Sequence, residues 1–132
     1  MPKIPVNLDE MQTTLPDLDE SIPYHGIVRK CALADEPDKN GHWYLTGVYI
    51  EVLDPEEFKG RVVGQNYMPI VQGKATGDFD IQFPRFVKTF KVPLDSDGDF
   101  DPSLAVGCEG DFTVMMDEYQ GRKLPKVKDF LM

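Results

Sequence analysis

The chain has 132 residues, of which 41% are hydrophobic and 11% aromatic, and its formal net charge is −9. This composition excludes an intrinsically disordered protein, and the length suits one folded domain. No apolar run approaches the roughly 18 residues of a membrane span, and the first residues lack the apolar stretch of a secretion signal. We therefore expect a cytoplasmic protein that does not contact a membrane.

The acidic charge is concentrated in two segments. Residues 1–23 carry a net charge of −4, and the run DSDGDFD at residues 95–101 carries another −4. Residues 120–132 instead hold four basic side chains against one acid, a net charge of +3. A negative overall charge opposes nucleic-acid binding through the long-range field, but this segregation leaves room for a basic groove in an acidic protein.

The predicted elements follow an N-terminal arm in the order strand, strand, strand, helix, strand, strand. Residues 1–22, with several prolines and many acids, predict a poorly ordered arm. Phe83, Phe86 and Phe90 recur at helical spacing and predict a short helix within residues 81–92. The predicted strands are rich in aromatic and β-branched residues and lie at residues 24–36, 42–53, 61–71, 110–119 and 122–131.

This order predicts a mainly β fold, a five-stranded OB-like barrel with one short helix between the third and fourth strands. The barrel would cover residues 23–132. Gly26, Gly47 and Gly64 lie inside predicted strands, where glycine can mark bulges or sharp bends. An SH3-like barrel and a small β-sandwich have similar strand content and stay open as alternatives.

Several stretches carry a resemblance that covers residues 20–131. They are IPYHGIV at 22–28, IEVLDPEEFKGRVV at 50–63, FPRFVKTF at 83–90, AVG at 105–107 and EYQGRKLPKVKDFL at 118–131. In order and local pattern the chain resembles the phage-encoded single-stranded DNA-binding proteins of OB-fold type, a group long catalogued as a domain of unknown function.

The resemblance implies non-enzymatic, largely sequence-independent binding of single-stranded DNA during phage DNA replication or recombination. The protein would act in the cytoplasm of a bacterial host, with replication or recombination proteins as further partners and a homodimer as one assembly. Many such proteins end in an acidic tail, which this sequence lacks, so either a tail was trimmed or the acidic arm takes its role.

Single-strand binders need basic side chains for phosphates and flat aromatic rings on which bases stack. Strict alternation in residues 42–53 places Trp43 and Tyr49 on one face with Leu45, and Tyr44 and Val48 on the core face. The same rule pairs Arg61 with Tyr67. The candidate nucleic-acid-binding residues are Trp43, Tyr49, Tyr67, Arg61, Lys39, His42, Tyr119, Arg122, Lys126 and Lys128.

Plainer interpretations compete with this hypothesis. Trp43 could belong to the core, and the basic residues of the last strand could form a solvated face that discourages edge pairing. In the alternative function, the chain is an acidic protein–protein interaction module that binds a basic host or replication partner through an exposed aromatic patch.

Neither a metal site nor a catalytic site is expected. Asp95, Asp97 and Asp99 have the alternate spacing of an EF-hand loop, but Phe100 stands where that loop needs glycine and Val106 where it needs glutamate. The histidines, His25 and His42, have no partner that spacing identifies. Cys31 and Cys108 show no metal-binding spacing and are expected to be buried, reduced thiols. We therefore predict a non-enzyme without a cofactor.

Overall fold

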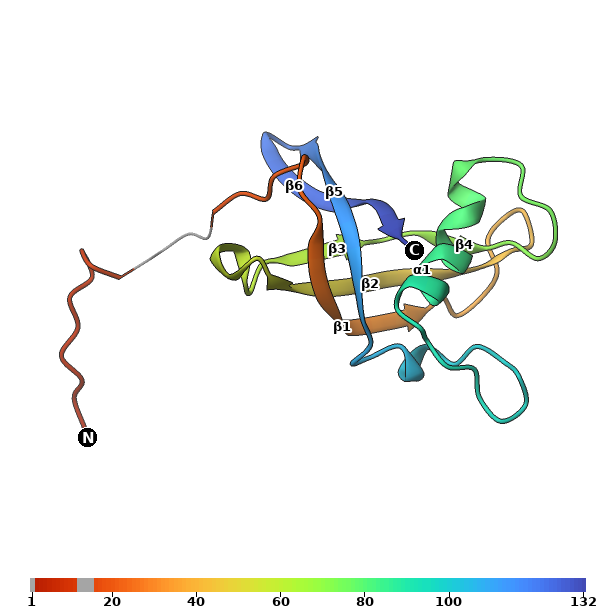
Figure 1. Ribbon diagram of the computed structural model, residues 1–132, viewed down its shortest axis with the longest axis horizontal. Helices are drawn as coiled ribbons and strands as arrows, with labels where there is room; N and C mark the ends of the chain where they lie inside the picture. The colour runs from red at the N-terminus through yellow and green to blue at the C-terminus, as the bar shows by residue number, and fades with distance from the viewer. Residues whose placement is uncertain (1, 12–15) are drawn as a thin grey trace.

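One antiparallel β-sheet forms the body of the protein. The computed structural model describes residues 2–11 and 16–132, and for Phe79 and Tyr119 it describes the backbone alone. The strands are β1 (Tyr24–Leu33), β2 (Trp43–Asp54), β3 (Val62–Gln65), β4 (Met68–Ile70), β5 (Glu109–Tyr119) and β6 (Arg122–Leu131), and the α-helix is α1 (Gln82–Thr89) (Figure 1). Short 3₁₀ turns lie at Glu56–Phe58, Asp78–Ile81 and Pro102–Leu104.

The sheet is open, with the strand order β3-β2-β1-β5-β6 and with β4 paired to β2. Its two edge strands, β3 and β6, contact each other, but they are not neighbours in the hydrogen-bonded order of the described strands. The mainly β prediction is confirmed, whereas the closed, five-stranded barrel is wrong. The predicted third strand splits into β3 and β4, so the helix follows the fourth strand and not the third.

A bulge in β2 interrupts the alternation of side chains. Ala32 pairs with Gly47 and Leu33 with Leu45, so Thr46 has no partner in β1. Leu45 and Val48 consequently both point into the core, where each is fully buried. The prediction that Leu45 lies on the exposed face is wrong, because one extra residue in a strand reverses the face of every side chain beyond it.

Aromatic rings fill the core between the sheet and α1. Helical spacing places Phe86 and Phe90 on one face of α1, where their ring centroids lie 5.6 and 5.9 Å from that of Phe130 on β6. The helix contacts both β4 and β6. It therefore covers the core near the place where the two edges of the sheet meet. An amphipathic helix packs its apolar face on the core, and the phenylalanines that predicted this helix lie on that face.

The arm is attached to the sheet at its C-terminal part. Leu18 is buried in the core, and the Glu20 carboxylate accepts a hydrogen bond from the backbone N–H of Met116 at 2.6 Å. The Tyr24 hydroxyl accepts another from the N–H of Asp19 at 2.6 Å. Residues 2–11 are exposed and lie away from the sheet (Figure 1). None of the helices in the described segments is long and apolar enough to cross a membrane.

Replacing Gly26 by alanine should lower the free energy of unfolding by about 1–3 kcal/mol, the usual cost of overpacking. A Cβ at Gly26 would lie 2.6 Å from Ile50 Cγ2 and 2.9 Å from the ring of Phe112. Urea unfolding followed by circular dichroism measures the change. Gly77→Ala is the matched control, because a Cβ there meets no atom within 4 Å. Equal stability of the two variants would contradict the close packing.

Candidate nucleic-acid interface

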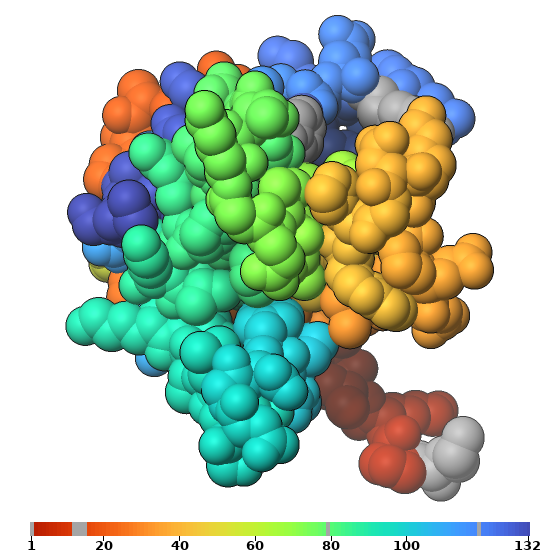
Figure 2. Space-filling view, turned by 90° about the vertical axis from the view of Figure 1, so that its right-hand side faces the viewer, coloured from red at the N-terminus to blue at the C-terminus, as the bar shows by residue number. Residues whose placement is uncertain are grey.

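Three adjoining hollows follow the seam between β3 and β6. One, of about 430 Å³, is lined by Gly64, Asn66, Asp117, Leu124, Pro125 and Lys126. The others continue it toward Tyr67 and along β6 toward Lys128, and Lys126 lines all three. We call these hollows together the groove. Figure 2 shows an opening between the orange β1–β2 turn and the blue β5–β6 hairpin, on the side where the groove lies.

Tyr49 forms part of the surface beside the groove. It pairs with Gly64 across β2 and β3, and its ring lies directly over this glycine, 3.1 Å from where a Cβ would be. The Lys30 ammonium lies 5.4 Å from the centre of the same ring. The ring is half-buried, with Gly64 beside it and the Lys30 ammonium over it, so an unpaired base would stack on this ring only by displacing the lysine side chain.

A second aromatic surface is built from Tyr44 and Tyr67, whose ring centroids lie 5.1 Å apart at an interplanar angle of 44°. The Tyr67 hydroxyl donates a hydrogen bond of 2.7 Å to the Asp38 carboxylate in the β1–β2 turn. This bond is the main reason why the pKa of Asp38 is lowered and that of Tyr67 raised. Sequence alternation assigned Tyr44 to the core, and the bulge at Thr46 turns it outward instead.

Trp43 does not join Tyr49 on one face. Trp43 pairs with Ile70 on β4, and two residues further along β2, Leu45 pairs with Met68. The side chains of Leu45 and Met68 are both buried. Trp43 is thus on the inward side of β2 at the end of the sheet, where it is 45% exposed. The predicted stacking platform of Trp43 with Tyr49 is wrong, because the bulge separates the two residues onto opposite faces.

Arg61 does not pair with Tyr67 either. Val63 and Gln65 of β3 both point into the core. Arg61 therefore precedes β3 on the core side and is half-buried, whereas Tyr67 follows the other end of the strand. Alternation correctly placed Arg61, Val63 and Gln65 on one face, but it is the buried face.

Of the remaining predicted cations, two lie on β6 at the groove. Lys126 and Lys128 line one hollow together, and Lys126 forms an ion pair of 2.6 Å with Asp117. Lys39 is exposed in the β1–β2 turn, and His42, at the end of the same turn, is half-buried. Arg122 is exposed at the β5–β6 hairpin, where its backbone pairs with Tyr119. The side chain of Tyr119 lies outside the described part of the chain.

The acidic loop brings three carboxylates together. Ligand oxygens of Asp95, Asp97 and Asp99 lie within 4.8 Å of one another, the one such group of three found among the described residues. Asp95 already accepts hydrogen bonds of 2.9 Å from the backbone N–H groups of Asp97 and Asp99. These bonds account for the turn. Cys31 and Cys108 are free thiols, and burial raises the pKa of Cys31 to about 11.

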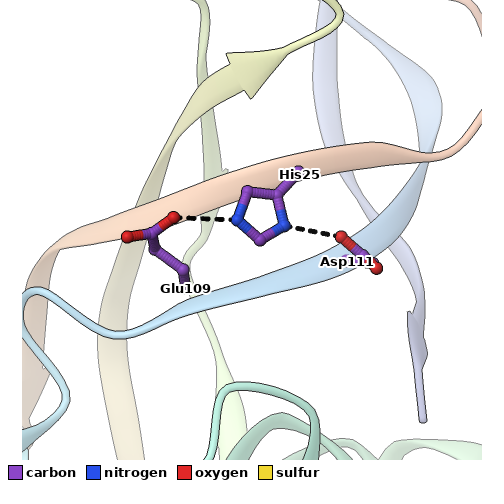
Figure 3. A network of polar contacts seen from close by, with 3 residues as sticks. All are labelled: His25, Glu109 and Asp111. Atoms are coloured by element: carbon purple, nitrogen blue, oxygen red, sulfur yellow. Dashed lines mark hydrogen bonds and ion pairs between the residues drawn. The ribbon is translucent and has the colours of Figure 1, made fainter.

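Sequence spacing missed the partners of His25. Its Nδ1 lies 2.7 Å from an Asp111 carboxylate oxygen and its Nε2 2.8 Å from one of Glu109, both on β5 (Figure 3). A carboxylate only accepts hydrogen bonds, so both bonds form together only when the imidazole is protonated. The hydrogen bonds to Asp111 and Glu109 therefore raise the pKa of His25. All three side chains are more than a third exposed, and we interpret the triad as a cross-strand ion cluster.

No protein-family model matches the chain, and no curated protein matches it.

The stability contributed by the His25 triad should depend on pH. Because the folded-state pKa of His25 is raised above 6.5, the contribution is fully present below pH 6.5 and is lost as the pH rises through the folded-state pKa. An NMR titration of the His25 ring gives this pKa directly. Glu109→Gln and Asp111→Asn should each lower it. A His25 pKa that neither substitution moves would contradict the ion cluster.

Proposed function

We propose that this protein binds single-stranded DNA without catalysing a reaction and largely without sequence preference. The bound strand would lie along the groove, with bases against Tyr49 and the Tyr44–Tyr67 pair. The observation that carries the proposal is that Tyr44 and Tyr49 lie on the outward face of β2, with Tyr67, between β3 and β4, packed against Tyr44. The resemblance of residues 20–131 supports a role in phage DNA replication or recombination, with replication or recombination proteins as further partners.

The strand order supports an OB-type arrangement of this sheet. In OB folds, the face of strands 2 and 3 and the loops that flank it bind oligonucleotides. Here β1 pairs with both β2 and β5, and the edges β3 and β6 lie next to each other, as that arrangement requires. Tyr49 on β2 and Gly64 on β3 are on the corresponding face.

Stacking, more than charge, would supply the affinity. Each base stacked on an aromatic ring contributes about 1–3 kcal/mol. The cations near the groove are few, and one of them, Lys126, is already paired with Asp117. The net charge of −9 also opposes the approach of a polyanion. We therefore expect modest affinity, a preference for unpaired over paired bases, and a shallow dependence on salt.

Tyr49→Ala should weaken binding of a fluorescein-labelled oligo(dT) by about tenfold, because one stacking surface is lost. Fluorescence anisotropy at low salt measures the affinity, and the matching duplex should bind more weakly than the single strand. Trp43→Ala is the matched control and should have a smaller effect, since Trp43 is on the opposite face of β2. If wild-type protein binds neither strand at low salt, the proposed function is wrong.

Replacing Lys126 and Lys128 together by alanine should make the plot of log affinity against log salt shallower. Each phosphate contact on a single strand releases about 0.7 ions, so the slope should fall by roughly 1 to 1.5. The same anisotropy titration at several salt concentrations gives the slope. Lys59→Ala, which removes an exposed cation from the turn before β3, should leave it unchanged. If the double variant leaves the slope unchanged, the two lysines of β6 do not contact the phosphates.

The arm favours a second function, a protein–protein interaction module for a basic host or replication partner. Ile4, Val6 and Leu8 are 61–82% exposed, alternate along the chain and are followed by Asp9 and Glu10. Residues 8–10 form a turn, and an exposed segment of this kind can dock on another protein through its apolar side chains, while its acids select a basic surface.

A further inference from the structure

A separate hollow lies between the β1–β2 turn and the tyrosine pair. Its volume is about 500 Å³, within the roughly 300–1,000 Å³ of small-molecule sites, and we call it the turn pocket. Its lining includes Glu36, Asp38, Lys39, Asn40, Tyr44 and Tyr67. The aromatic rings of Tyr44 and Tyr67 form one side, and the polar residues of the turn form the other.

Hydrogen bonds hold the turn pocket in shape before any ligand arrives. One oxygen of Asp38 accepts from the backbone N–H groups of Asn40 and His42, at 2.8 and 3.0 Å. The other oxygen accepts from the Tyr67 hydroxyl at 2.7 Å, which ties the turn to the aromatic pair. Gly41, at a φ of 80°, closes the turn. Binding of a ligand therefore costs little conformational entropy for ordering these residues.

The charge of the turn pocket selects against phosphate. Glu36 and Asp38 carry two negative charges and Lys39 one positive charge, so these side chains sum to −1. A flat, uncharged ring that presents N–H donors fits better than a phosphate, because carboxylates only accept hydrogen bonds. Exposed acceptors are present on the Glu36 carboxylate and the Asn40 amide, and the second oxygen of Asp38 accepts a single hydrogen bond from the described residues.

Nucleobases differ in the N–H donors that their edges present. Cytosine, adenine and guanine carry an exocyclic amino group, whereas thymine presents carbonyl oxygens on both sides of its single N–H. Carboxylate and amide side chains accept hydrogen bonds from base amino groups, and single-stranded bases expose these edges. Thymine carbonyls would face the carboxylates and repel them.

Resting on the proposed binding of single strands, we propose that the turn pocket takes one unpaired base and prefers a base with an exocyclic amino group over thymine. The base packs against the rings of Tyr44 and Tyr67, and acceptors among Glu36, Asp38 and Asn40 take the two hydrogen bonds that its amino group can donate. The groove itself binds without preference, so the selectivity is confined to the one nucleotide that enters the turn pocket.

The experiment compares labelled oligo(dC) and oligo(dT) of equal length, chosen within the roughly 4–16 nucleotides that one OB-type sheet covers. Anisotropy at neutral pH gives both affinities for wild-type protein, Glu36→Gln and Asp38→Asn. Asparagine can still accept the backbone hydrogen bonds of the turn, and circular dichroism checks that each variant is folded. Glu56→Gln, an exposed carboxylate in the turn after β2, is the matched control for a lost charge.

We expect wild-type protein and Glu56→Gln to bind oligo(dC) about fivefold or more tightly than oligo(dT), and both pocket variants to reduce this ratio. Equal affinities for the two strands would overturn the base preference and leave the proposed function standing. If neither pocket variant changes the ratio of the oligo(dC) and oligo(dT) affinities, the base preference does not arise in the turn pocket and this proposal is wrong. If neither oligonucleotide binds, both proposals are wrong.

Discussion

The close approach of β1 and β5 at two glycines is the constraint on which the sheet depends. Gly26 pairs with Gly110, and a Cβ on Gly26 would touch Ile50 and Phe112, while one on Gly110 would lie 2.9 Å from the Phe90 ring. Without side chains there, β1 can bend against β5 and still pair with β2 along its length. That bend brings the far edges, β3 and β6, next to each other, and the groove follows their seam.

The groove combines aromatic surfaces with cations that are largely compensated. Lys126 pairs with Asp117, and the β1–β2 turn carries acids beside Lys39. Such a surface holds a strand by its bases more than by its phosphates, since each paired lysine must give up a carboxylate before it meets a phosphate. Because binding would depend mainly on the bases, the negative charge of the whole chain is compatible with the proposed DNA groove.

The sequence predicted those features that depend on local periodicity. The helix was predicted from the spacing of its phenylalanines, and the closing hairpin from two strand signals at residues 110–119 and 122–131, because each of these signals is local in the sequence. Alternation gave the right faces for Val48 and Tyr49, but the faces of residues 43–45 were not predictable, because nothing in WYLTGVY marks Thr46 as the extra residue. The partners of His25 lie more than 80 residues away. In a regular strand, alternation predicts the face on which a side chain lies, but it does not predict which residue of another strand lies opposite it.

The position of the lone tryptophan decides what its fluorescence can report. Trp43 lies at the end of β2 beside β4, partly exposed, and on the face opposite Tyr49. Its emission follows the solvent around that end of the sheet and the turn next to it. A strand stacked on Tyr49 would leave the indole in its own surroundings, so unchanged emission is compatible with binding. Quenching of Trp43 would instead point to a ligand that reaches round the end of the sheet.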